Sequence, residues 1–218
     1  MMRISRSMTG KSVRRMAFAV TFAAALCSCS SSGSGSGSND AATHPGTLDP
    51  KFGNSGTVNT DLGSLADRAN AVALQSDRRI VVAGSTQDPA QGDNLAILRY
   101  TGDGKLDASF GTGGKVSTDF GGKSDIARAV SIQSDGRVVA VRTSHGTGTG
   151  DNIALARYTS NGTLDHSFGT DGKVSTDLGT QADHANAAAI QSDGRIIVAG
   201  TTKDPSQSDN IAVMRYHG

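Results

Sequence analysis

Charged residues recur at a constant interval in this sequence and are its first candidates for chemistry. Successive copies stand 58 residues apart, at Asp61, Asp119, Asp177, Arg99, Arg157 and Arg215. One hypothesis is a ring of ligand-binding sites, with one carboxylate and one guanidinium in each repeat. The other is a set of structural ion pairs between strands, because an arginine buried in an apolar strand needs an acidic partner. The apolar residues around the arginines favour the structural ion pairs.

Calcium is the one cofactor that the spacing of oxygen-bearing residues brings into question. Asp103 and Asp107 stand at i and i+4 beside Gly104, and Asn161 and Asp165 repeat that spacing in the next copy. A calcium loop needs several oxygen ligands and commonly ends in a bidentate glutamate. Each loop offers two such side chains, and all 20 acidic residues of the chain are aspartates. We therefore expect no cofactor, with calcium as the weaker alternative.

Catalytic constellations are not indicated. The five histidines share no position of the interval, so their spacing supports neither a metal centre nor a catalytic triad. His145, His166 and His184 are the asymmetric candidates that a hydrolase or lyase would have to use. We expect the protein not to be an enzyme.

The charge distribution divides the chain into two parts. The first 29 residues contain five of the 21 Lys and Arg residues and none of the 20 acids. The remainder is therefore mildly acidic and lacks the concentrated basic patch that a nucleic-acid partner requires. Abundant Gly and Asp favour turns, and the expected body consists of many short strands.

The first 47 residues have the pattern of an export and anchoring sequence. A basic segment precedes the apolar run Ala17–Leu26, which is about half the length that spans a bilayer. The following Leu26-Cys27-Ser28-Cys29 resembles a bacterial lipobox, which implies a signal peptide over 1–28 and lipidation of Cys29. A Ser/Gly-rich tether would occupy 29–47. The alternative is an ordinary cleaved signal; with lipidation, we expect an anchor in the outer membrane or at the cell surface.

The body, 48–218, consists of three copies of one repeat, at 48–105, 106–163 and 164–218. The Leu-Asp-x-x-Phe-Gly segment starts each copy, and Gln-Ser-Asp and Arg-Tyr recur at the same step of 58 residues. Each copy predicts four strands, and Asp193-Gly194 between two β-rich runs is the clearest hairpin signal. Four strands per repeat fit a β-propeller, but three such units also fit a β-trefoil or a β-prism.

Resemblance to a known family favours the propeller. Leu164–Val174, Asn186–Gly200 and Asn210–Tyr216 resemble the start, middle and end of the delta-sixty repeat of bacterial surface proteins. This resemblance implies a propeller-like fold and brings no catalytic residues. Arg78, in place of the hairpin Gly, and Val141-Arg142, in place of Ala-Gly, depart from the pattern and predict weakened copies. Closed propellers have about four to eight blades, so we expect an open partial propeller or a ring completed by a homodimer.

The function predicted from these features is a non-catalytic binding or scaffold module at the cell envelope, with a protein or a glycan as its partner. The alternatives are a carbohydrate-binding, lectin-like module and, less favoured, a hydrolase or lyase on a propeller frame. A lectin usually stacks sugars on aromatic rings, but the chain has no Trp. Its recurrent Phe and Tyr positions are expected in the core.

Overall fold

A computed structural model describes residues 45–89, 92–121, 124–145, 150–179, 182–203, 206 and 208–218. Signal peptide, Cys29 and nearly all of the tether, as predicted from the sequence, lie outside these residues. Thr43–Gly218 forms one compact unit. None of the described segments forms an apolar helix of membrane-spanning length.

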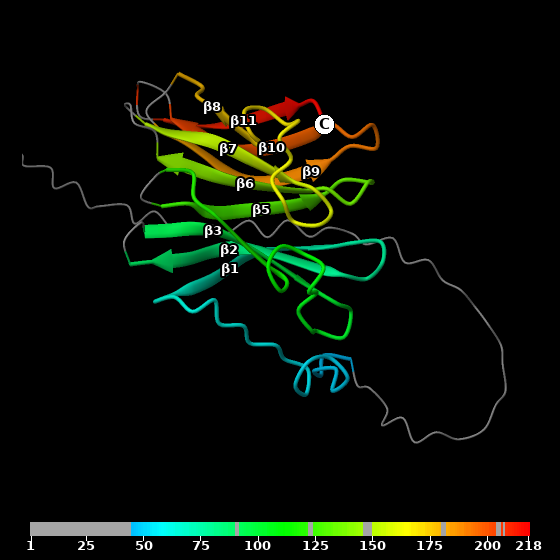
Figure 1. Cartoon of the computed structure of the whole chain (residues 1–218). Helices are drawn as coiled ribbons and strands as arrows, with labels where there is room; N and C mark the ends of the chain where they lie inside the picture. Colours follow the sequence, from blue (N-terminus) through cyan, green and yellow to red (C-terminus); the bar gives the residue numbers. More distant parts are fainter. Residues whose placement is uncertain are drawn as a thin grey trace, which may run out of the picture. The chain divides into compact units, whose positions relative to one another are not determined.

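The described residues fold into three antiparallel sheets, so the predicted all-β class is confirmed (Figure 1). The first sheet contains β1 (Asp67–Leu74), β2 (Ile80–Asp88), β3 (Gly92–Tyr100) and β4 (Lys115–Thr118). The second contains β5 (Ile126–Ile132), β6 (Val138–His145), β7 (Asp151–Tyr158) and β8 (Lys173–Thr176). The third contains β9 (Asp183–Ile190), β10 (Ile196–Lys203) and β11 (Asp209–Tyr216). None of the three sheets closes on itself.

The sheets are offset from the sequence repeats by one strand. β4 lies in the second copy of the repeat but pairs with β3 of the first, and β8 of the third copy pairs with β7 of the second. Each such strand ties one copy to the next. In the first copy the corresponding residues 57–60 form no strand, and Thr57 makes only isolated bridges to Gly53 and Asn54.

The hairpins form where the sequence predicts them. In the second copy, Gly136 N–H donates to the Gln133 carbonyl and Gln133 N–H donates to the Arg137 carbonyl, both at 2.9 Å. This turn needs a positive φ, which is 84° at Gly136 and at Gly194. Arg78 adopts the same conformation with φ of 71°, a backbone region that disfavours residues with a Cβ.

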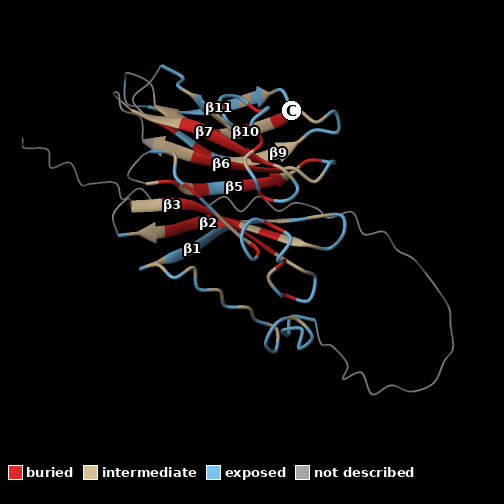
Figure 2. Ribbon diagram, viewed as in Figure 1, coloured by how far each residue is buried: buried red, intermediate tan, exposed pale blue. Residues whose placement is uncertain are grey.

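Apolar side chains fill the two spaces between successive sheets. The first cluster joins Leu95 and Ile97 of β3 to Val130 and Val138 of the second sheet. The second joins Leu155 of β7 and its neighbours to the third sheet. β2, β3, β6 and β7 supply most of the buried residues, as Figure 2 shows. Burial on both faces explains why these strands read as continuous apolar runs rather than as an alternation.

A tyrosine hydroxyl links neighbouring units at the same repeat position. Tyr158 of β7 donates to Thr118 of β4 at 2.8 Å, and Tyr216 of β11 donates to Thr176 of β8 at 3.0 Å. The same bond joins Tyr100 of β3 to Thr60 at 2.8 Å. Residues 57–60 are therefore held against the first sheet at the place that β4 takes against the second.

Candidate functional site

The recurrent arginine is buried in a polar network at the hairpin end of each interface between sheets. Arg157 Nε donates to Asp165 Oδ2 at 2.9 Å, and Arg157 Nη2 donates to the Ser167 hydroxyl at 3.2 Å. The guanidinium carbon of Arg157 lies 4.5 Å from the centroid of the Phe168 ring. Arg99 repeats these contacts with Asp107, Ser109 and Phe110.

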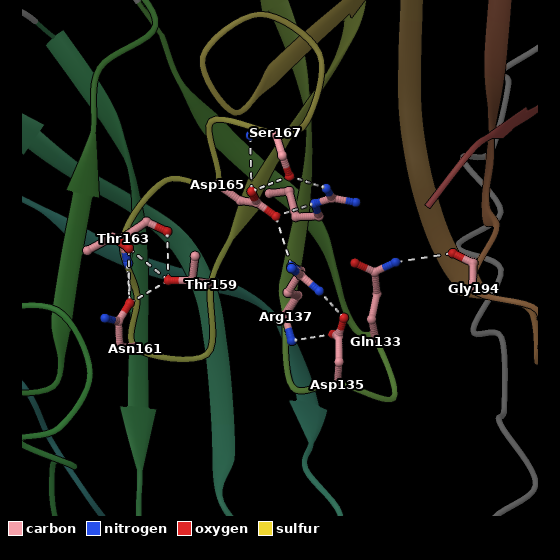
Figure 3. A network of polar contacts seen from close by, with 10 residues as sticks. Gln133, Asp135, Arg137, Thr159, Asn161, Thr163, Asp165, Ser167 and Gly194 are labelled. Atoms are coloured by element: carbon pink, nitrogen blue, oxygen red, sulfur yellow. Dashed lines mark hydrogen bonds and ion pairs between the residues drawn. The ribbon is translucent and has the colours of Figure 1, made fainter.

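A second arginine joins each network from the hairpin, as Figure 3 shows for the second copy. Arg137 Nε donates to the same oxygen of Asp165 at 2.9 Å and also pairs with Asp135. Asp165 Oδ1 accepts hydrogen bonds from the backbone N–H and the hydroxyl of Ser167 (Figure 3). Both carboxylate oxygens of Asp165 therefore accept hydrogen bonds. The network holds the loop around Asp165 against the hairpin that contains Arg137.

Hydrogen bonding stabilises the charged form of this aspartate. The Ser167 hydroxyl, with help from the Ser167 N–H and from Arg157 and Arg137, lowers the pKa of Asp165 to about 2. The pKa of Asp107 is lowered by Ser109 in the same way. A carboxylate with so low a pKa is a poor general base near neutral pH, which agrees with a structural role.

The prediction that the recurrent aspartates pair with the recurrent arginines named the wrong aspartates. Asp61, Asp119 and Asp177 accept hydrogen bonds from the N–H two residues ahead, at Gly63, Gly121 and Gly179. Arg99 and Arg157 instead pair with Asp107 and Asp165, the aspartates of the Leu-Asp-x-x-Phe-Gly segment in the following copy. The short Asp side chain favours this local turn, whereas the offset of the sheets brings Asp107 and Asp165 beside the arginines.

Arg215, the third recurrent arginine, differs from the other two because it is exposed on β11. Arg99 and Arg157 are only 4% and 6% exposed. Each of those two pairs with an aspartate eight residues ahead.

A further buried ion pair lies at β6 of the second sheet. Arg142 is 1% exposed, pairs with the fully buried Asp125, and places its guanidinium carbon 4.3 Å from the Phe120 ring centroid. Burial lowers the pKa of Arg142 to about 10. The other copies have Gly84 and Gly200 here, where an added Cβ would lie 1.8 Å and 2.0 Å from a backbone oxygen.

In the first candidate calcium loop, both carboxylates interact with other side chains of the protein. Asp103 interacts with Thr101 and Lys105, while Asp107 pairs with Arg79 and Arg99. Within the part of the chain that the structure describes, no cluster of three potential metal ligands occurs.

The asymmetric histidines are not assembled into one site by any described contact. His166 lies 3.4 Å from Asp171, and His184 lies 3.8 Å from Asp151. Both His166 and Asp171 are strongly exposed, at 75% and 82% of their side-chain surface. The side chain of His145 lies outside the described residues.

A cavity of about 460 Å³ is present at the other end of the first sheet. Its lining includes Leu62, Thr86, Asn94 and Lys115. Asn94 is 8% exposed, and its Oδ1 atom is buried with no hydrogen-bond partner among the described atoms. An unpaired buried acceptor costs about 1–3 kcal/mol, and protein atoms cover this oxygen almost completely, so a ligand would reach it only if those atoms moved.

The repeat itself explains why the cavity is in the first sheet. Phe120 of the second copy stands at the position of Leu62, and Lys173 at that of Lys115. Lys173 Nζ lies 4.6 Å from the centroid of the Phe120 ring. The first copy thus has the smaller Leu62 where the second copy places an aromatic ring.

Comparison with known proteins agrees with this architecture. Residues 75–110, 133–168 and 191–217 match the model of a family described as "Domain of unknown function (DUF5122) beta-propeller". The chain is built from propeller-like repeats. Its open sheets form a partial propeller, as predicted, whereas the delta-sixty assignment and the lipoprotein signal stay predictions.

Two solved structures show more distant similarity to the propeller repeats. A fucose lectin from Kordia zhangzhouensis, in complex with methyl-fucoside, is 12% identical with a TM-score of 0.40; the match covers 68% of this chain and 96% of the lectin. A protein of unknown function from Bacteroides caccae is 13% identical with a TM-score of 0.37, over 69% of this chain and 46% of that one. No curated protein matches the sequence.

Sequence reasoning missed three features of the propeller repeats. The first is the pairing of Arg99 and Arg157 with the aspartate of the Leu-Asp segment. That aspartate recurs at the same 58-residue interval as the arginine, and this shared interval was a signal for the pairing. The Arg142–Asp125 pair had a weaker signal, a charged residue in a Gly position. The only sequence signal for the cavity was that Leu62 stands where the second copy has Phe120. The sequence alone does not show that this difference in side-chain size leaves a space.

Proposed function

We propose that this protein is a non-catalytic binding module that is exported and held at the outer membrane or cell surface by lipid on Cys29. The export pattern of residues 1–28 and the lipobox-like Leu26–Cys29 support the anchor. The arginine networks support a body without catalytic groups, because their carboxylates are already paired with arginines and accept hydrogen bonds from serine hydroxyls.

The cavity at Leu62 carries the binding part of the proposal. Its lining includes Thr86, Asn94 and Lys115, and the Lys115 Nζ already donates to the Asp61 carbonyl at 2.8 Å. Polar groups that converge in a concave site fix the orientation of a ligand. We therefore assign the cavity to a hydroxyl-rich ligand of the glycan class, whose hydroxyl groups would pair with the polar side chains of the lining. None of the residues that line the cavity is aromatic, so recognition rests on hydrogen bonds and not on ring stacking.

An array of surface glycans tests this proposal. The full chain, purified in a mild detergent, is expected to bind a subset of the array. Leu62→Phe should fill the cavity as Phe120 fills the second copy, and we expect it to weaken binding by about tenfold or more, because a filled site excludes the ligand.

Leu178→Phe is the matched control, since Leu178 occupies the same repeat position in the third copy. It adds the same ring away from the cavity and should leave glycan binding unchanged. A wild-type chain that binds no glycan, or a Leu62→Phe variant that binds as well as the wild type, would refute the proposed site.

A further inference from the structure

The last sheet exposes an apolar face that the same residues bury elsewhere in the chain. Ile211 and Val213 of β11 are 87% and 66% exposed. Their counterparts Leu95 and Ile97 in β3 are fully buried against the second sheet. β11 therefore carries the docking surface of an interface whose other side is missing.

The first sheet exposes the opposite side of that interface. Val72 and Leu74 of β1 are 64% and 73% exposed. Six of the eight residues of β1 are exposed, and Figure 2 draws the strand mostly in pale blue. Their counterparts in β5 are Val130, which is 8% exposed, and Ile132, and both pack against the cluster between the first and second sheets.

We propose that the β11 face of one chain docks on the β1 face of a second copy, and that two copies close a ring. The chain already forms this interface twice, between its first and second and between its second and third sheets. The two exposed faces are the two unused halves of the same interface, so they are complementary in shape and polarity. Such a contact is head-to-tail, and it closes if two identical contacts form.

The register of the docked strand follows from the strands within the chain. Ile97 pairs with Val116, and Leu155 pairs with Val174. By the same step, Val213 lies opposite Val58 of the second copy. Residues 57–60 of that copy then become the fourth strand of the third sheet, and the exposed edge of β11 is covered. Proteins generally protect such edges.

Charge complementarity supports the same arrangement. Arg215 is exposed on β11, and Asp49 is exposed in the Leu48-Asp49 segment that precedes residues 57–60. Asp49 corresponds to Asp107 and Asp165, the partners of Arg99 and Arg157. Docking would place Arg215 beside Asp49 of the second copy and complete a third network like those at Asp107 and Asp165.

The number of sheets agrees with two copies. The described residues of one chain form three sheets, and two copies would supply six, which is within the range of about four to eight blades found in closed propellers. Three chains would exceed that range.

Charge exchange at Arg215 and Asp49 tests the proposal. The full chain in a mild detergent is expected to have the mass of two copies by light scattering or native mass spectrometry. Arg215→Asp or Asp49→Arg alone places like charges together, and we expect each to raise the dimer dissociation constant by roughly 100-fold or more. The double variant restores opposite charges at both contacts and should recover the dimer.

Leu65→Lys serves as the control. Leu65 is 72% exposed but lies in the loop before β1, at a position where the other copies have Lys123 and Gln181. It should leave the mass unchanged. A monomeric wild type, an open series of larger species, or a double variant that stays monomeric would overturn the proposal. Asp49 and Arg215 do not line the Leu62 cavity, so this test and the glycan test can fail separately.

Discussion

Several charged side chains of this protein are buried, and their contribution to stability depends on whether all their hydrogen bonds and ion pairs are formed. Asp165 is 7% exposed and accepts from two arginines and a serine. Two charges removed from water are tolerated when their hydrogen bonds are complete, but removing one partner leaves the others unpaired. The network therefore contributes mainly by fixing the position of the loop around Asp165 against the hairpin at Arg137.

Asp165→Asn should lower the free energy of unfolding by about 3 kcal/mol at neutral pH, because it leaves the buried Arg157 guanidinium without a counter-charge. The folded-state pKa of Asp165, about 2, lies below its ordinary value of 3.8. Its ionic contribution is therefore present above that ordinary value and is lost as the pH falls towards 2.

The difference in stability between wild type and Asp165→Asn should accordingly narrow between pH 5 and about pH 2. Chemical denaturation across this pH range measures it. Asp177→Asn, at an exposed turn, is the control and should cost much less. A difference that is independent of pH would contradict the assigned charge state.

Arg142→Gly is a second test at this scale, because it restores the residue found in the other two copies. We expect it to destabilise the protein by about 3–5 kcal/mol, since it leaves Asp125 buried without its cation. Thermal or chemical unfolding measures the loss. A gain in stability would mean that Arg142 weakens its copy, as the sequence pattern predicted.

At the scale of elements, the hairpin between β1 and β2 is formed against the local preference of its residues. Arg78 has a φ of 71°, and Gly136 and Gly194 have 84° at the equivalent positions. A side chain in this region costs about 1 kcal/mol, which the pairing of β1 with β2 must offset.

Arg78→Gly should therefore stabilise the protein by about 1 kcal/mol and raise its Tm by about 2–4 °C. The reverse change, Gly194→Arg, should lower the Tm by a similar amount, because an added Cβ at Gly194 meets no atom within 4 Å and only the backbone cost remains. Differential scanning calorimetry compares the three proteins. Equal melting temperatures would exclude this account of the hairpin.

At the scale of the whole molecule, the sheets are offset from the sequence repeats, so two successive copies of the repeat contribute strands to each interface. β4 and β8 connect successive sheets along the chain, and the tyrosine–threonine bonds connect them across the interface. Repeat proteins of this kind gain stability from contacts between neighbouring repeats. Among the described residues, the first and third sheets each have one face that no neighbouring sheet covers.

Membrane attachment is the prediction that concerns the whole chain. If Cys29 is lipidated, the wild type should partition into the detergent phase and sediment with the outer membrane. Cys29→Ala should release it, because the apolar run Ala17–Leu26 is too short to span a bilayer. Cys27→Ala is the matched control and should leave the protein attached. A wild type found wholly in the aqueous fraction would exclude the lipid anchor.

The sequence by itself determined the features that repeat locally. Strand positions, the Asp-Gly hairpins and the buried Phe110, Phe168 and Tyr158 followed from periodicity and turn chemistry. These features depend on residues within one repeat, so the 58-residue step was enough to identify them.

Only the tertiary structure decided which residues meet. Arg99 and Asp61 share the first copy, yet Arg99 pairs with Asp107 of the second. The cavity at Leu62 and the exposed faces of β1 and β11 likewise arise from how one sheet lies against the next. Sequence periodicity is the same for every copy, whereas burial depends on whether a neighbouring sheet is present.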